Sequence, residues 1–160
     1  MVQWFNESMD KFIRELDEQF ANLHRRSCAL IERLSPEQLY LQLPATVDSC
    51  GEQLLRSAAI VEQAFGGLTA NLWDDPFEWT LPETLSTSAK VIEYLNEVET
   101  TRCEAFQLFK SDQDLEKEIM APTGKTQLRP FLLDTLERAR HHQQRAIAAL
   151  DHLTQKSNDS

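Results

Sequence analysis

The sequence predicts an all-α protein, a four-helix bundle with two long connections. Four stretches space apolar residues three and four positions apart, which is typical of helices buried along one face. They lie in residues 9–34, 54–68, 91–109 and 132–153. We expect one domain over residues 1–154, followed by a disordered polar tail at 155–160. No segment alternates convincingly enough to predict a strand.

The first half of the chain carries two helix starts. The first helix is expected from about Asn6 to Leu34. Residues 35–38 (Ser-Pro-Glu-Gln) then form a capping box that opens one short turn. A second box, Ser49 to Glu52, begins the second helix, which should end at Gly66-Gly67 or just beyond.

A connection of nearly twenty residues follows, with Trp73, Phe77 and Trp79. Structureless loops of this length are uncommon, so we expect these aromatic residues to fold it against the helices.

The third helix should run from Ser86 or Ser88 to about Lys110. The second long connection contains an acidic stretch at 112–118 and a turn at 122–124. The fourth helix should begin near Thr126, with Pro130 in its first turn, and end near Thr154. Connections this long permit crossovers, so a simple up-down-up-down order is not assured.

Composition excludes several classes of partner. The net charge is −10, and phosphate binding needs clustered Lys and Arg, so we expect neither nucleic acid nor an anionic membrane as partner. No apolar run approaches the roughly 20 residues of a membrane span. The first residues lack a signal-peptide layout, which predicts a cytoplasmic protein.

The three cysteines are expected to be free thiols, and a helix dipole would lower the pKa of Cys50.

Two polar residues fall within the apolar seams. Arg102 and Gln143 should point toward the centre of the bundle, where each is costly unless it has a partner. Glu62 and Glu99, at the edges of their apolar stripes, are the candidate partners. Polar groups in a bundle core are also where such folds build sites.

The fourth helix carries a histidine and an arginine one turn apart. His142 and Arg138 form an i, i+4 pair on the shoulder of the buried face, whereas His141 points outward. His142 is read either as a hydrogen-bonded core histidine or as part of a site.

Two short segments resemble the DinB/YfiT-like family. Residues 49–56 (SCGEQLLR) resemble the opening of the family's second helix, and residues 136–144 (LERARHHQQ) its last helix. Residues 122–125 also fit. The resemblance implies a four-helix bundle, usually up-down-down-up and often a homodimer. Family members include metal-dependent hydrolase-like proteins and transferases acting on low-molecular-weight thiols.

The family's metal site does not carry over intact. Typical members hold a divalent metal through three histidines, one on the second helix and two on the last. Those positions fall here on Arg56, Arg138 and His142, so only His142 is retained as a metal ligand. Arginine offers only donors and cannot coordinate a cation. The resemblance therefore implies a degenerate site with no cofactor.

Three functions remain open. The first is a small-molecule-binding or interaction module without metal catalysis. The second is a hydrolase or thiol transferase that holds zinc or nickel through a variant ligand set around His142. The third is a purely structural dimeric partner protein.

For the first, we expect Arg56 and Arg138, helped by Arg102, to occupy the space of the lost metal, balanced by Glu62 and Glu99. That cluster would be either a structural ion-pair network or a pocket for a small anionic ligand, since arginine forks suit carboxylate and phosphate.

Overall fold

A computed structural model describes residues 10–42, 48–78 and 82–159. Four α-helices dominate this part of the chain: α2 (Lys11–Glu32), α3 (Cys50–Ala70), α4 (Ser88–Phe106) and α5 (Leu128–Asn158). The prediction of a mainly helical chain with four helices is confirmed. Two 3-10 helices, η1 (Pro76–Glu78) and η2 (Asp112–Glu116), lie in the connections, and β1 (Glu118–Ala121) pairs with β2 (Gly124–Gln127) in an antiparallel hairpin.

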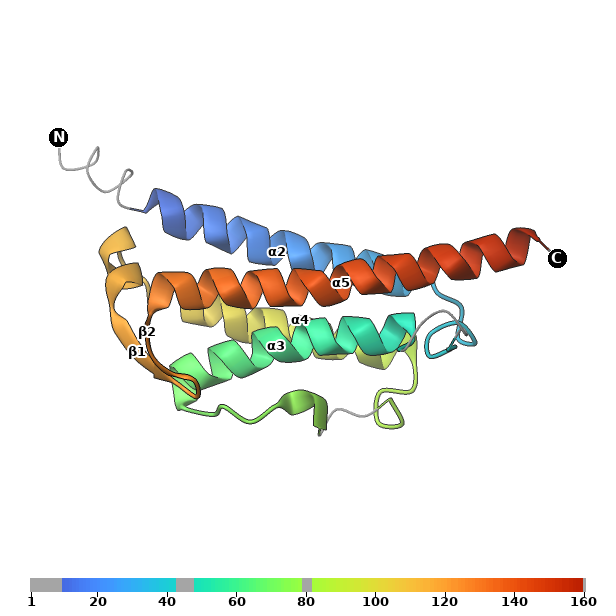
Figure 1. The fold of residues 1–160 in the computed structure, drawn as a ribbon, viewed down its shortest axis with the longest axis horizontal. Coiled ribbons are helices and arrows are strands. Elements are labelled where there is room, and N and C mark those ends of the chain that lie inside the picture. The colour runs from blue at the N-terminus through green and yellow to red at the C-terminus, as the bar shows by residue number, and fades with distance from the viewer. Residues whose placement is uncertain (1–9, 43–47, 79–81, 160) are drawn as a thin grey trace.

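The helices lie lengthwise beside one another. The most extensive contact is between α3 and α5, and α4 packs on both α2 and α3 while α5 also touches α2. In Figure 1, α2 and α5 run in one direction and α3 and α4 run in the other. None of the described helices combines the length and apolar character that a membrane span requires.

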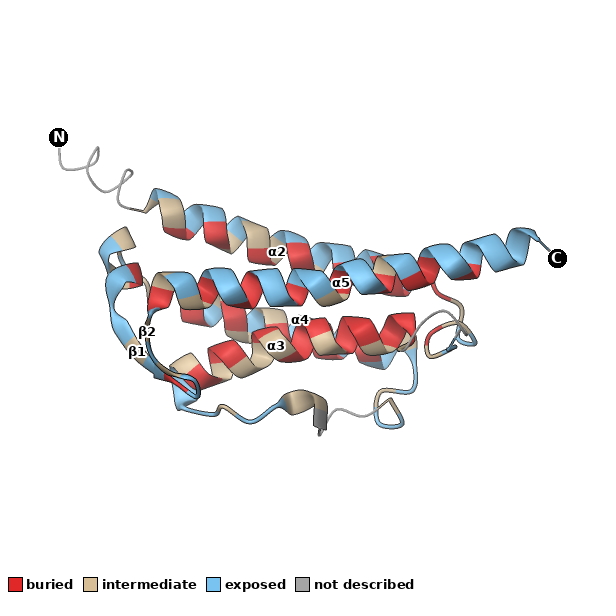
Figure 2. Cartoon of the chain, viewed as in Figure 1, coloured by how far each residue is buried: buried red, intermediate tan, exposed pale blue. Residues whose placement is uncertain are grey.

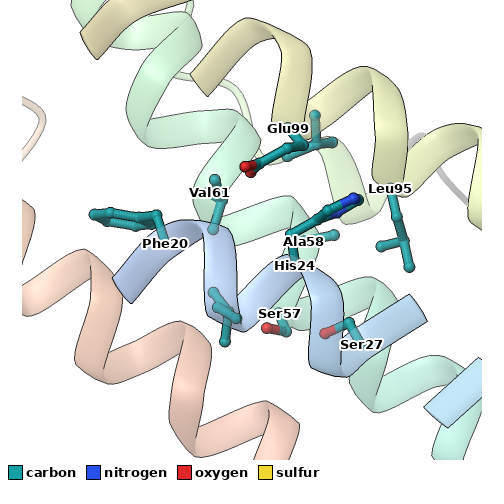
Figure 3. A pocket seen from close by; sticks show the side chains of 10 residues that line it. Phe20, His24, Ser27, Ser57, Ala58, Val61, Leu95 and Glu99 are labelled. Carbon is teal, nitrogen blue, oxygen red and sulfur yellow. The ribbon is translucent and has the colours of Figure 1, made fainter. Parts of the chain in front are cut away.

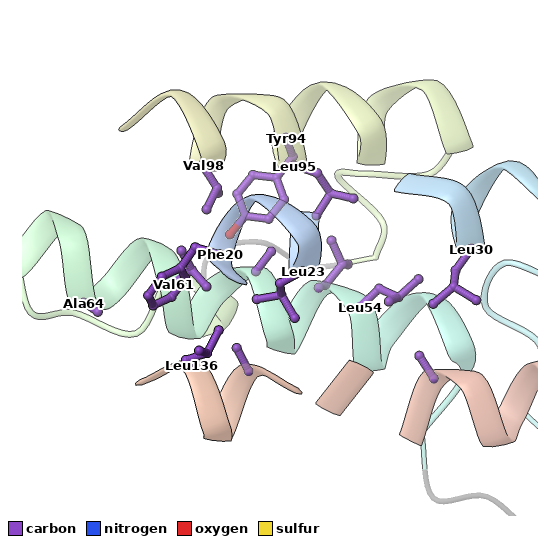
Figure 4. Packing of buried hydrophobic residues seen from close by; sticks show 14 of the residues in the cluster. Phe20, Leu23, Leu30, Leu54, Val61, Ala64, Tyr94, Leu95, Val98 and Leu136 are labelled. Atoms are coloured by element: carbon purple, nitrogen blue, oxygen red, sulfur yellow. The ribbon is translucent and has the colours of Figure 1, made fainter. Parts of the chain in front are cut away.

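The buried residues form stripes that face the centre (Figure 2). Three aromatic rings from three helices, Phe20, Phe65 and Phe106, meet there with centroids 5.4 to 5.8 Å apart. Figure 4 shows aliphatic side chains filling the space along this cluster, including Leu136 from α5. Burial of these stripes is the main stabilising contribution to the fold, because each helix alone would expose its apolar face.

In both predicted capping boxes the serine hydroxyl accepts a hydrogen bond from a backbone N–H three residues later. Gln38 N donates to Ser35 Oγ over 3.3 Å, and Ser35 N donates to Gln38 Oε1 over 3.0 Å. Only one turn follows. At the start of α3, Glu52 N donates to Ser49 Oγ over 3.2 Å.

The N-terminal cap of α2 comes from a residue about 100 positions later in the chain. The Asp10 side chain makes no capping hydrogen bond with the described residues. Instead, Phe12 N and Ile13 N donate to the Asp112 carboxylate over 3.3 and 3.1 Å. The first residue of η2 thereby holds the first turn of α2, and a carboxylate is favoured at this positive end of the helix.

Several predicted helix ends are wrong. α4 ends at Phe106 rather than Lys110, because the Asp114 carboxylate draws the backbone N–H groups of Lys110 and Ser111 into the cap of η2. α5 continues to Asn158, so most of the tail predicted to be disordered is helical. Neither glycine nor proline occurs after residue 130 to stop this helix.

The β1–β2 hairpin is missing from the sequence prediction, although its turn was recognised. Each strand has four residues, and only Ala121 is buried, so the alternation is too weak to detect. Gly124 closes the turn with a φ of 118°, a conformation that favours glycine.

The connection after α3 folds against the helices, as expected. The Trp73 ring lies on Gly67, where an added Cβ would come within 2.1 Å of it, and meets Phe131 edge-on. Gln63 Nε2 donates to the Trp73 carbonyl over 2.7 Å. Trp79 lies outside the described residues.

Candidate functional site

Arg102 is fully buried and paired. Its guanidinium donates to Asp17 and Glu99, and Nε lies 3.1 Å from Glu99 Oε2. Burial acts to lower the pKa of Arg102, but the hydrogen bonds that it donates to Glu99 and Asp17 outweigh burial and raise that pKa. Glu99 is thus one expected partner. Asp17 lies on α2, 85 residues away, and nothing in the local pattern singles it out.

Gln143 is buried at the same depth between α5 and α2. Its Nε2 donates to the Leu23 carbonyl over 2.8 Å and to Ser27 Oγ over 2.9 Å. Because both seam residues have their hydrogen bonds satisfied within the protein, they serve the packing of the helices rather than a ligand.

A small cavity lies between α2, α3 and α4 (Figure 3). His24 lines it together with Ser27, Ser57 and Glu99. Its volume of about 30 Å³ suits one or two water molecules and no larger ligand.

The three arginines do not share one buried space, so that expectation is wrong. Arg102 lies between α4 and α2, whereas Arg56 and Arg138 lie on α3 and α5. Arg56 Nε donates to Asp48 Oδ2 over 2.9 Å, and its guanidinium stacks 4.0 Å from the Phe77 ring centroid.

Glu62 also has a different role from the one expected. Its carboxylate accepts a 2.5 Å hydrogen bond from the Tyr94 hydroxyl. Arg138 is 53% exposed, and the one ion pair that it forms within the described residues is with Asp134 on its own helix, 3.8 Å from its Nη1. Arg56 is therefore paired with Asp48, whereas Arg138 has only a distant, exposed carboxylate beside it.

A buried amide connects His142 to Asp48. Gln53 is 4% exposed, its Nε2 lies 3.3 Å from Asp48 Oδ2, and its Oε1 lies 2.7 Å from His142 Nδ1. A carboxylate only accepts, so the amide NH₂ faces Asp48 and the amide oxygen faces the imidazole. Nδ1 must then be the protonated nitrogen, and Nε2 of the neutral ring carries the lone pair.

The surroundings keep His142 neutral. Its pKa is lowered by burial first, and then by the positive potential of His141, Arg145 and Arg56, while Asp48 acts in the opposite direction. The imidazole is therefore an acceptor at Nε2 around neutral pH.

His142 and Arg138 line a groove between α3 and α5. One hollow of about 410 Å³ is lined by Ile60, Asp134, Glu137, Arg138, His141 and His142. A second, of about 370 Å³, shares Ile60, Asp134 and Arg138 and extends to Trp73 and Phe131. We call the two hollows together the α3–α5 groove.

The side chains at this end of α3 and α5 do not fit the three-histidine metal site that the resemblance implies. Of the two arginines at the implied histidine positions, Arg138 lines the groove and Arg56 does not, and neither can coordinate a cation. Nor do the described residues bring together any three His, Cys, Asp or Glu side chains in an arrangement able to hold a metal ion.

Sequence reasoning missed Gln53 and Asp48. A glutamine among apolar residues near the start of α3 was the available signal, because a buried amide there requires a partner. Arg56, three residues further along, contacts Asp48 and Phe77.

Comparison of the chain with protein-family models and with curated proteins finds no match. Function must therefore be argued from the groove itself.

Proposed function

We propose that this protein is a DinB-like four-helix bundle in up-down-down-up order that binds a small polar molecule in the α3–α5 groove, without the metal catalysis of the family. Two observations support this proposal. The helix directions in Figure 1 agree with that order. The groove also lies between α3 and α5 beside His142, where the resemblance puts the family's site.

The observation that carries the proposal is the state of Arg138. Its side chain lines both hollows of the groove and is half exposed. The 3.8 Å separation from Asp134 is too long for a hydrogen bond, and exposed pairs of this kind contribute little. The guanidinium can therefore present its planar fork to a carboxylate or phosphate.

The rest of the groove suits a ligand with more than an anionic group. Asp134 and Glu137 supply acceptors beside Arg138. Trp73, Phe131 and Ile60 supply apolar surface in the adjoining hollow. Such a mixture of apolar walls and a few polar groups is typical of small-molecule sites, and each hollow is of the usual size.

The proposal can be tested by titrating the protein with a panel of small carboxylates and phosphates, followed by NMR shift changes. Substitution Arg138→Gln should weaken binding roughly 10- to 100-fold, because a hydrogen-bonded charge contributes about 1.5–3 kcal/mol. The matched control is Arg140→Gln on the same helix, where the arginine donates to Gln19 on α2. Equal effects of both substitutions, or no binding by any probe, would contradict the proposal.

The metal-free part has its own test. Elemental analysis of the purified protein should find neither zinc nor nickel in stoichiometric amount, and stoichiometric metal lost in His142→Gln would refute it. The resemblance also leads us to propose a homodimer. Size-exclusion chromatography with light scattering would establish or exclude it.

A further inference from the structure

We infer that Gln53 locks His142 in one tautomer, and that the α3–α5 groove thereby selects ligands with a hydrogen-bond donor on the carbon next to their carboxylate. This inference rests on the proposed binding of an anion at Arg138. It assigns Gln53 a positioning role and narrows the ligand class.

The tautomer follows from a chain of three groups. Turning the Gln53 amide over would place its oxygen against the Asp48 carboxylate, which already accepts from Arg56 Nε over 2.9 Å. The amide oxygen must therefore face His142, where 2.7 Å separates it from Nδ1. An unprotonated Nδ1 at that distance would set two lone pairs against each other, so Nδ1 keeps its proton.

The ligand class follows from what the locked ring presents to the groove. Arg138 and His142 line the same hollow, one helical turn and about 6 Å apart along α5. Arg138 can only donate and Nε2 can only accept. A short ligand satisfies both when a hydroxyl or ammonium group adjoins its carboxylate, as in 2-hydroxy and 2-amino acids.

The first test needs no ligand. Long-range ¹H–¹⁵N spectra of the free protein at neutral pH should show His142 protonated at Nδ1 alone, with the signals assigned by their loss in His142→Gln. Gln53→Met, which keeps the side-chain length but removes the amide, should give a mixture of tautomers. Gln144→Met, at an exposed amide on the helix that carries His142, should leave the spectrum unchanged.

A second variant covers a failure of Gln53→Met to fold. Gln53→Leu also removes the amide without adding a charge beside Asp48, and it should likewise give a mixture of tautomers. Protonation of His142 at Nε2 in the unmodified protein would overturn the inference.

The second test uses three probes with one carbon skeleton: propionate, lactate and alanine. Lactate, alanine or both should bind roughly 2- to 10-fold more tightly than propionate, because one added hydrogen bond increases the affinity by about that factor. Gln53→Met should reduce this difference, because only part of the variant protein would present an acceptor at Nε2.

The outcomes separate the two proposals. Equal binding of all three probes, with loss in Arg138→Gln, would refute the ligand selection but leave anion binding in place. If none of these probes shows Arg138-dependent binding but other anions do, the inferred ligand class is wrong while the proposed function stands. If no anion shows it, both are wrong.

Discussion

Replacing Arg102 by methionine should destabilise the fold through the charges that it leaves behind. The guanidinium is 1% exposed and joins α4 to α2 through Asp17 while also pairing with Glu99 on its own helix. Methionine keeps most of the apolar stem that packs near Phe20 and Phe106, so the main loss is the counter-charge.

The magnitude depends on how far the two carboxylates regain water. Removing one partner of a fully buried pair costs about 3–5 kcal/mol. Here Glu99 is 18% and Asp17 50% exposed, so both are partly rehydrated. We therefore expect Arg102→Met to lower the free energy of unfolding by about 2–3 kcal/mol, equivalent to roughly 5–10 °C in Tm.

Urea denaturation followed by circular dichroism measures this change. The double variant Arg102→Met/Glu99→Gln should recover about 1–2 kcal/mol, because it removes the stranded charge as well. Arg25→Met, at an exposed pair with Glu18, is the matched control and should change stability by less than about 0.5 kcal/mol. A loss below about 1 kcal/mol for Arg102→Met, or no recovery in the double variant, would refute this reasoning.

Three further predictions concern other contacts. Asp112→Ala should lower the free energy of unfolding by about 1 kcal/mol and speed hydrogen exchange in the first turn of α2, because its carboxylate caps that turn; unchanged exchange would argue against the cap. Gly67→Ala should cost about 1–3 kcal/mol and alter tryptophan fluorescence, since the new Cβ would displace the Trp73 ring, whereas Gly66→Ala, with its nearest contact at 3.3 Å, should cost less. Cys50 should resist thiol reagents at pH 8 until the protein unfolds, because burial raises its pKa to about 12; rapid labelling of native protein in which the other two cysteines are serine would contradict this.

The helices could be predicted from sequence because apolar spacing reports which face of a helix is buried. The same pattern placed Arg102 and Gln143 in the core, as observed. Helix ends were less predictable, since the end of α4 depends on which backbone N–H groups the Asp114 carboxylate binds. The prediction of a lowered pKa for Cys50 is wrong, because burial raises that pKa to about 12.

The groove was harder to foresee than the core. His142 and Arg138 were recognised from their i, i+4 spacing, and they line the same hollow. The partner of His142 is Gln53, which lies 89 residues earlier on another helix. Periodicity describes which way a side chain points, but it cannot say which residue of a neighbouring helix stands opposite, and polar pairing depends on that register.

The long-range cap on α2 bears on the order in which a nascent chain can acquire structure. Helix α2 is translated before the other described helices and finds its main packing surfaces on α4 and α5. The Asp112 carboxylate that completes its first turn follows 100 residues after the Phe12 amide that it binds. Local contacts alone cannot stabilise this segment during synthesis. We therefore expect the amides of α2 to become protected from hydrogen exchange late, after the C-terminal half has been translated.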